Sequence, residues 1–212
     1  MSIQGSRPNE SATSSTTTRD CSLDGGADIQ VEVLFLTGPP GAGKTAIAKE
    51  LSELLWQLRE PHAVIEIDEL CRGILPTSTT NFNHNLAVAN LRAVWATFQQ
   101  AGVRRLIVAR MVETLDDLER FASVIPHAHV TVCLVQTPEH ILQQRITGRE
   151  PGSARLFLLT TSRRVAAQLA DLKLPGIAVD NGQRSISEVA REILERVQWP
   201  YPPASSVGLS EV

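Results

Sequence analysis

Short apolar runs rich in β-branched residues alternate with longer helical patterns through the middle of the chain. Near-continuous apolar runs are typical of strands that are buried on both faces. The runs predict strands at residues 31–37, 63–67, 105–109, 130–135 and 177–179. Strands that alternate with helices build a parallel sheet with helices on both sides. The pattern therefore predicts an α/β fold of three layers, with about five parallel strands.

Two segments repeat apolar residues every three or four positions, which is the spacing of one helix face. The first segment follows the first predicted strand and contains Ile47, Leu51, Leu54 and Leu58. The second contains Leu86, Asn90, Val94 and Phe98, with Asn90 as its one polar member. Both patterns predict helices that bury these side chains against the sheet.

The composition is that of one soluble domain. The chain has 212 residues, of which 42% are hydrophobic and 20% charged, close to ordinary globular usage. No apolar run approaches the roughly 18 residues that a membrane span needs. The net charge of -3 gives no basic face for nucleic acid. Three cysteines without a CxxC pair favour a reducing compartment. We therefore expect a cytoplasmic monomer or homodimer that binds neither membrane nor nucleic acid.

The two ends of the chain differ in composition from the middle. Residues 1–28 are rich in Ser and Thr and almost lack large apolar side chains, so we expect a disordered tail without a secretory signal. Residues 200–212 contain three prolines and are predicted to be a short C-terminal extension. The folded domain is expected to span residues 29–199.

The most specific motif lies between the first predicted strand and the first predicted helix. It fits the pattern G-x-x-x-x-G-K-[ST] and consists of Gly38, Pro39, Pro40, Gly41, Ala42, Gly43, Lys44 and Thr45. Glycines let the backbone fold into a concave nest whose N–H groups face a phosphate. A simple glycine-rich turn is the alternative, but the strand–turn–helix setting favours a phosphate-binding loop.

The last two residues of this motif carry the chemistry. Lys44 is expected to place its ammonium between the β- and γ-phosphates, and the Thr45 hydroxyl is expected to be a ligand of Mg²⁺. The chain lacks the Asn-Lys-x-Asp and Asp-x-x-Gly segments of GTPases, so ATP is the expected nucleotide. The sequence therefore predicts a P-loop NTPase fold with ATP and Mg²⁺ as cofactors.

A second candidate nucleotide contact follows the last predicted strand. Asn181 and Gly182 lie in a strand–loop–helix segment that is similar to the one with which small kinases pack the adenine ring. An ordinary turn followed by a helix that Ser187 caps explains the same residues equally well.

The segment Val64-Ile-Glu-Ile-Asp-Glu-Leu-Cys-Arg72 ends a predicted strand with a carboxylate at the edge where α/β sheets bind ligands. Here the sequence resembles the P-loop small-molecule kinases, particularly the adenylylsulfate kinase and chloramphenicol phosphotransferase group. The resemblance implies that Asp68 accepts the acceptor's proton or orients its hydroxyl, and that Arg72 binds substrate beside it. The alternatives are a helix N-cap for Asp68 and a surface salt bridge for Arg72.

A helix after the fourth predicted strand carries Arg145 and Arg149 four residues apart and then runs into Glu150-Pro151-Gly152. This arrangement resembles the small helical lid of a kinase. Guanidinium groups on a closing lid stabilise the charge that spreads over a phosphoryl group in transfer. The alternative is a solvated helix face.

The third predicted strand lacks the terminal aspartate that many P-loop enzymes use near the metal, and continues instead into Arg110 and Glu113. Glu113 is predicted to replace that carboxylate as a metal ligand, or else to cap or salt-bridge the next helix. Arg110 is predicted to contact phosphate or substrate. The acceptor pocket is expected between residue 68 and the third strand, with Asn90 among its polar groups and Trp95 more typical of a core residue.

Together these residues predict an ATP-dependent phosphotransferase that moves the γ-phosphate to a small-molecule acceptor, such as an antibiotic, a nucleotide-like molecule or a secondary metabolite. Two alternatives remain open. One is an ATP-hydrolysing switch that acts through a protein partner, and the other is a domain that binds nucleotide without turnover.

Overall fold

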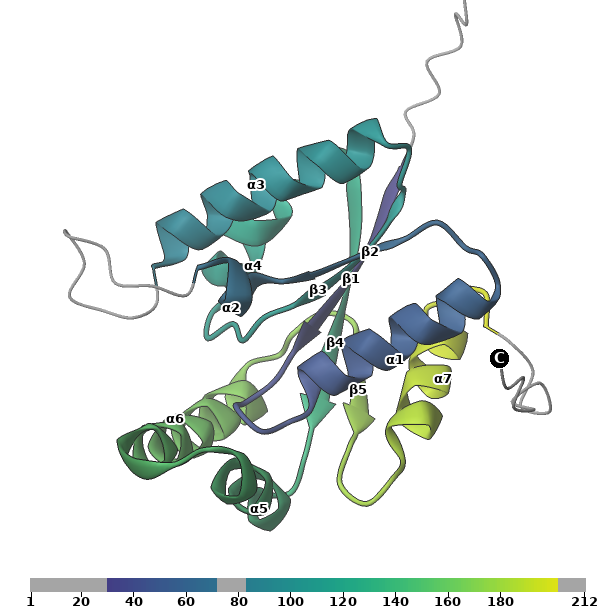
Figure 1. Ribbon diagram of the computed structural model, residues 1–212. Helices are drawn as coiled ribbons and strands as arrows, with labels where there is room; N and C mark the ends of the chain where they lie inside the picture. The colour runs from purple at the N-terminus through teal and green to yellow at the C-terminus, as the bar shows by residue number, and fades with distance from the viewer. Residues whose placement is uncertain (1–29, 72–82, 202–212) are drawn as a thin grey trace, which may run out of the picture.

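The computed structural model describes residues 30–71 and 83–201. Within these ranges five parallel strands form one sheet in the order β2-β3-β1-β4-β5 (Figure 1). The strands are β1 Val31–Thr37, β2 Ala63–Glu66, β3 Arg105–Ala109, β4 Ala128–Gln136 and β5 Ile177–Asp180. The predicted parallel sheet is confirmed, with β4 longer than predicted and β2 one residue shorter.

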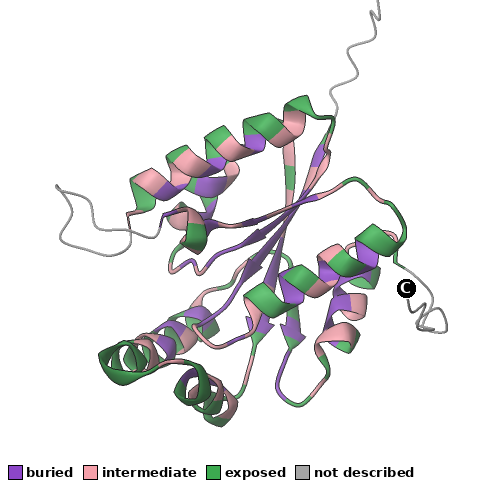
Figure 2. Cartoon of the chain, viewed as in Figure 1, coloured by how far each residue is buried: buried purple, intermediate pink, exposed green. Residues whose placement is uncertain are grey.

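Helices cover both faces of the sheet, which confirms the three predicted layers (Figure 1). Helices α1 and α7 pack together on one face, and α3 and α4 lie on the other. Helices α5 and α6 pack against each other beyond the carboxyl ends of the strands, where a lid is expected. The bounds are α1 Lys44–Gln57, α2 Ile67–Leu70, α3 His84–Gln100, α4 Leu115–Ala122, α5 Glu139–Arg149, α6 Gly152–Asp171 and α7 Ile186–Arg196. Figure 2 shows the buried strands between the exposed outer faces of the helices.

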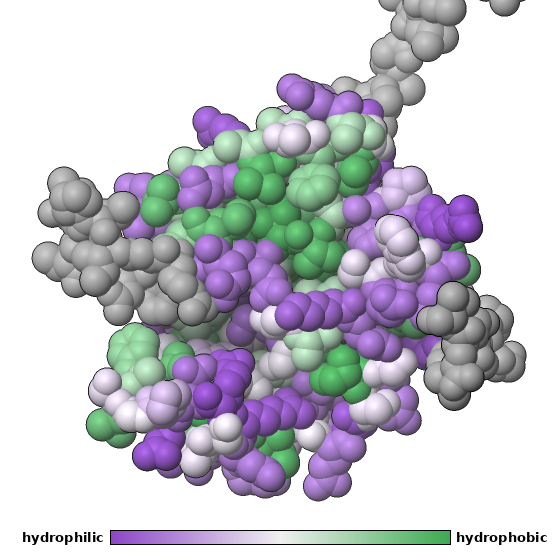
Figure 3. Space-filling view, viewed as in Figure 1, coloured by the Kyte–Doolittle hydropathy of each residue, from purple (hydrophilic) through white to green (hydrophobic). Residues whose placement is uncertain are grey.

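Strand β2 forms one edge of the sheet and pairs with β3 alone among the described strands. Apolar surface gathers between α1 and α3, over this edge (Figure 3). The sheet is therefore covered on its two faces but open along β2.

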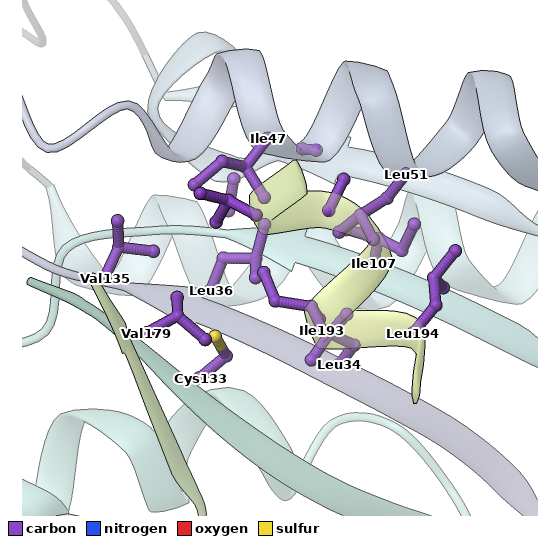
Figure 4. Close-up of a cluster of buried hydrophobic side chains, with 14 of the residues drawn as sticks. Leu34, Leu36, Ile47, Leu51, Ile107, Cys133, Val135, Val179, Ile193 and Leu194 are labelled. Atoms are coloured by element: carbon purple, nitrogen blue, oxygen red, sulfur yellow. The ribbon is translucent and has the colours of Figure 1, made fainter. Parts of the chain in front are cut away.

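Alternate side chains of β1 point to opposite faces of the sheet and belong to two separate cores. Leu34 and Leu36 pack with Ile47 of α1 and Ile193 of α7 (Figure 4). On the other face Phe35 lies 6.1 Å from the ring of Phe121, measured between centroids. Burial on both sides explains why the sequence of this strand is apolar at nearly every position.

The buried face of α3 is one residue later than the predicted one. Its buried members are Ala87, Leu91 and Trp95, which confirms Trp95 as a core residue. The predicted stripe of Leu86, Asn90, Val94 and Phe98 lies at the margin of the core and is partly buried. In α1 the predicted stripe is buried except for Leu58, which is 37% exposed because it caps the end of the helix.

Several predictions concern residues outside the described ranges. These are the tail 1–28, Arg72 and nearly all of the extension 200–212. Within the described ranges, no helix combines the length and the apolar character required to cross a bilayer.

Candidate active site

The predicted site residues follow the carboxyl ends of different strands. The glycine-rich loop follows β1, Asp68 lies two residues after β2, Arg110 directly follows β3, and Asn181 directly follows β5. Because the strands are parallel, these ends meet at one edge of the sheet. The fold thereby gathers groups that are up to 143 residues apart in the sequence, from Gly38 to Asn181.

The glycine-rich loop has a backbone that other residues would not adopt. Gly43 has a φ of 97°, and a Cβ at this position would collide with the amide nitrogen of Asn181. Gly38 has a φ of 152°, and its Cβ would lie 2.6 Å from the carbonyl oxygen of Val135. The loop therefore needs glycine both for its conformation and for its close approach to β4 and to the loop after β5.

Neighbouring elements fix the shape of this loop. The Asn181 side-chain amide donates to the carbonyl oxygen of Ala42 at 2.7 Å, and the Ser162 hydroxyl of α6 donates to that of Pro40 at 2.9 Å. Thr137 donates to Ala42 at 3.3 Å. These bonds satisfy the carbonyl groups of Pro40 and Ala42 and hold the loop in one conformation. Nothing in the sequence distinguishes Ser162 or Thr137 from other hydroxyl residues.

Lys44 begins α1 and folds back over the loop. Its ammonium donates hydrogen bonds to the carbonyl oxygens of Gly38 at 2.9 Å and Pro39 at 3.2 Å. Burial lowers the pKa of Lys44 from its ordinary value of 10.5 to about 8. The lysine predicted to contact phosphates is thus held at the mouth of the loop, with a proton that it releases unusually easily.

Four further charged groups act on the same ammonium. The carboxylates of Asp68 and Glu66 raise the pKa of Lys44, whereas the guanidinium groups of Arg149 and Arg110 lower it. They come from β2, α2, α5 and the end of β3. The structure therefore brings Lys44, Asp68 and Arg149 into one electrostatic neighbourhood, together with Glu66, which the sequence analysis missed.

Glu66 lies beside the predicted metal ligand. The Thr45 hydroxyl donates a 2.6 Å hydrogen bond to its carboxylate. A hydroxyl and a carboxylate oxygen are the hard donors that Mg²⁺ prefers. One signal for Glu66 was present in the sequence, because it lies at the carboxyl end of a predicted strand, the edge at which α/β sheets bind ligands.

Glu113 has a different partner from the one predicted. Both of its carboxylate oxygens accept hydrogen bonds from the Arg164 guanidinium of α6, at 2.5 and 2.8 Å. These bonds lower the pKa of Glu113. Helix α4 is capped instead by Thr114 and Asp117. Glu113 thus forms a salt bridge, but to α6 and not to the next helix as predicted, and the carboxylate that contacts Thr45 is Glu66.

Asp68 is held by a buried arginine. Arg110 is 2% exposed and donates a 2.5 Å hydrogen bond to the Asp68 carboxylate, whose side chain is 44% exposed. The Arg110 guanidinium also lies over the ring of Phe121, 5.4 Å from its centroid. Asp68 is not the N-cap of α2, since Glu66 holds that position. The geometry leaves one face of Asp68 open to solvent and turns Arg110 toward the protein.

Asn90, predicted to bind substrate, bridges two helices. Its amide donates to the carbonyl oxygen of Leu70, at the end of α2, at 2.6 Å. This bond satisfies a carbonyl group that a four-residue helix leaves without an internal partner. It also connects α3 to the element that carries Asp68.

The two predicted lid arginines have different surroundings. Arg145 is partly buried and donates to the carbonyl oxygens of Asn181 at 2.9 Å, Gly182 at 3.4 Å and Ala42 at 3.4 Å. Arg149 is 65% exposed and pairs with Glu150 at 2.7 Å. Arg145 therefore connects the phosphate loop to the loop after β5, whereas Arg149 lies at the surface with a partner on its own segment.

The loop after β5 begins with a fully buried amide. Asn181 donates to Ala42, while its side-chain oxygen lacks a hydrogen-bond partner within the described part of the chain. The helix that follows is capped by Ser185, which forms a capping box with Glu188, and not by the predicted Ser187. A hydrogen-bonding group and a buried backbone at Gly182 thus lie next to the phosphate loop.

A glycine-rich loop between the first strand and first helix of a parallel sheet with this strand order defines a P-loop protein of the α/β class. A family model described as an AAA domain matches residues 34–165, which is more than half of the chain. The chain therefore belongs to this AAA domain family of P-loop proteins. Among curated proteins, no sequence matches it.

Solved structures share the whole fold at low sequence identity. The tunicamycin resistance protein of Deinococcus radiodurans is 20% identical with a TM-score of 0.61, over 82% of this chain and 99% of that one. The APS kinase of Mycobacterium tuberculosis, in complex with AMPPNP and APS, is 18% identical with a TM-score of 0.52, over 80% and 98%. The shikimate kinase of Acinetobacter baumannii, in complex with shikimate, is 16% identical with a TM-score of 0.52, over 81% and 96%. These likenesses confirm the predicted fold of the P-loop small-molecule kinases.

Proposed function

We propose that the protein is an ATP-dependent phosphotransferase that moves the γ-phosphate of ATP to a hydroxyl group of a small molecule. The observation that carries this proposal is the position of Asp68. Its partly exposed carboxylate, in the short helix that follows β2, lies within electrostatic range of the P-loop lysine, Lys44. Nucleotide binding alone does not need such a carboxylate, whereas in transfer to a hydroxyl a carboxylate placed here can accept the hydroxyl proton.

ATP would lie with its phosphates on the glycine-rich loop and its base beside the loop after β5. The N–H groups of the loop and the start of α1 suit the β-phosphate. The base would lie against the segment of Asn181 and Gly182 and the guanidinium of Arg145. These groups place an amide and a flat cation next to the glycine-rich loop. The structure of APS kinase, which has the same fold, contains the ATP analogue AMPPNP, and this supports the choice of ATP as the nucleotide.

Thr45 and Glu66 would hold Mg²⁺. When bound, the ion neutralises charge on the β- and γ-phosphate oxygens. The ammonium of Lys44 contributes in the same region and bridges the two phosphates.

In the transfer step, Asp68 accepts the proton of the acceptor hydroxyl. The acceptor oxygen forms a bond to the γ-phosphorus, and the bond from that phosphorus to the β–γ bridging oxygen breaks. The products are ADP and the phosphorylated acceptor. Arg149, exposed on α5 and within electrostatic range of Lys44, stabilises the negative charge on the transferring group when the lid closes.

The proposal is tested by incubating the protein with MgATP and a pooled set of small alcohols, sugars, nucleosides and antibiotics, and by searching the products by mass spectrometry for added phosphate. Lys44→Ala and Asp68→Asn serve as controls. We expect a phosphorylated product that both variants lose, with ATP binding weakened mainly by Lys44→Ala. Formation of ADP and inorganic phosphate alone, at the same rate in Asp68→Asn, would contradict the proposal.

The AAA domain family favours a second candidate, an ATP-hydrolysing switch that acts through a protein partner. An ATP-dependent change in oligomeric state, measured by size-exclusion chromatography with light scattering, distinguishes it from the first. A transferase that turns over as a constant monomer or homodimer excludes this alternative.

A further inference from the structure

A groove of about 640 Å³ runs along the open edge of the sheet between α1 and α3 (Figure 3). Its apolar lining comes from four elements: Trp56 of α1, Val64 and Ile65 of β2, Leu70 of α2 and Val94 of α3. The site described above does not use these side chains.

The groove has the size and character of a ligand site. Pockets for small organic ligands typically measure about 300–1,000 Å³ and are lined mainly by apolar side chains. Trp56 is 71% exposed at its rim, so most of its indole surface is accessible to a ligand. Burial of Trp56 and its neighbours by a ligand would remove this apolar surface from water.

The groove shares a wall with the phosphate site. Glu66 lines the groove, accepts the hydrogen bond of Thr45 and acts on the charge of Lys44. Leu70 lies in the same short helix as Asp68. The element that carries Asp68 therefore also contributes to the wall of the groove.

The charges along the groove restrict what it takes. Its lining holds three carboxylates, Glu53, Glu66 and Glu69, and one ammonium, Lys49. This acidic balance disfavours an anionic occupant such as a sulfated or phosphorylated group. A neutral or cationic apolar group fits it better.

We propose that the groove binds the apolar part of the acceptor, so that the acceptor is an amphipathic alcohol. Its hydroxyl lies at Asp68, and its aliphatic or aromatic part lies along β2 between α1 and α3. This inference rests on the proposed function in one respect, that the molecule bound in the groove is the phosphate acceptor. Binding in the groove itself does not depend on phosphate transfer.

The first experiment measures binding without ATP. The protein is titrated by calorimetry with n-octyl β-glucoside below its micelle concentration, and with glucose. We expect saturable binding of the octyl compound only, with a blue shift of tryptophan fluorescence that Trp56→Phe removes. Trp56→Gln and Val94→Glu are expected to weaken binding at least tenfold, and Ala93→Glu, exposed on the same helix, to leave it unchanged.

Two results would overturn the inference. One is an affinity for octyl glucoside that is the same in the parent and in Trp56→Gln, since this change is at an exposed position. The other is a homodimer that Trp56→Gln dissociates and that binds no octyl glucoside, since the groove is then an interface between two copies of the chain.

The second experiment connects the groove to the acceptor. The acceptor screen includes matched pairs of alcohols with and without an alkyl chain, and kcat/KM is compared within each pair. A preference for the alkylated member that Trp56→Gln reduces supports the inference. Phosphorylation of the polar member with equal or higher kcat/KM refutes it while leaving the proposed function intact.

Discussion

The buried guanidinium of Arg110 donates a 2.5 Å hydrogen bond to the partly exposed carboxylate of Asp68, across 42 positions of the sequence. Arg110 also packs over Phe121 and lies close to the sulfur of Cys71, so its own position is fixed by the core. A rigid partner of this kind holds a carboxylate in one orientation. The contact that the structure shows for Arg110 is therefore the one to Asp68, whereas the sequence predicted a contact with phosphate or substrate.

Replacing Arg110 is expected to misplace Asp68. Arg110→Met should lower the kcat of phosphate transfer by roughly 100-fold, the scale of a misplaced catalytic group, and change the KM for ATP little. Arg110→Lys, which keeps the charge, should recover part of the rate. Steady-state kinetics of the two variants, with circular dichroism to verify the fold, checks this. An unchanged kcat in Arg110→Met would remove the positioning role.

The carboxylate at the metal site is expected to be Glu66. Mg²⁺ is expected to increase the affinity for ATP, and Glu66→Gln should make this increase smaller by roughly tenfold or more. A metal site loses affinity on this scale when one of its contacts is removed. Glu113→Gln is the matched control and should leave that gain unchanged, since its carboxylate pairs with Arg164. ATP titrations by calorimetry with and without Mg²⁺ measure both. The opposite ranking would restore Glu113 as the ligand.

The lowered pKa of Lys44 predicts how stability depends on pH. Below pH 8 the Lys44 side chain is charged in the folded and in the unfolded protein, and burial destabilises the charge only in the folded protein. Above pH 10.5 the side chain is neutral in both states. The folded state of the parent should thus gain about 1–3 kcal/mol relative to Lys44→Met as the pH rises between these values. Urea unfolding at several pH values tests this. Parallel pH curves for parent and variant would show that the pKa of Lys44 is ordinary.

Gly43 is expected to tolerate no side chain. Both Gly43 and Gly102 have a positive φ, which is 88° at Gly102. A Cβ at residue 43 would in addition clash with Asn181, whereas a Cβ at residue 102 would have open space around it. Both Gly43→Ala and Gly102→Ala should lose about 1–2 kcal/mol for the backbone conformation. Gly43→Ala should lose more and should also weaken ATP binding. Chemical denaturation and calorimetry compare them, and equal effects would mean that the Asn181 contact is unimportant.

The sequence was sufficient for the fold and for the phosphate loop. Apolar runs such as Val31–Thr37 are long enough to identify buried strands, and the pattern from Gly38 to Thr45 is specific because its fixed positions, two glycines, a lysine and a threonine, each have a physical role. The predicted buried face of α3, with Asn90 as its one polar member, lies one residue before the observed face of Ala87, Leu91 and Trp95. Neighbouring stripes on a helix are hard to separate when both contain apolar residues.

The partners within the site could not be predicted from spacing along the chain. The bond from Thr45 to Glu66 spans 21 positions, and that from Arg164 to Glu113 spans 51. Such pairs depend on strand order and on the placement of helices, which a single sequence does not give. The sequence predicted Arg145 and Arg149 on one helix, but only the packing of α5 against the loops distinguishes Arg145, which contacts those loops, from Arg149, which pairs with its neighbour Glu150 at the surface.

The fate of the γ-phosphate is the most direct test of the proposed phosphotransfer. ATP labelled in its γ-phosphate is incubated with Mg²⁺, a metabolite extract and either the parent protein or Asp68→Asn, and the label is followed into organic products and inorganic phosphate. We predict that the parent transfers label to an organic product and that Asp68→Asn still binds ATP but loses this transfer. Label that appears only as inorganic phosphate, equally with both proteins, would contradict the assignment of a phosphotransferase.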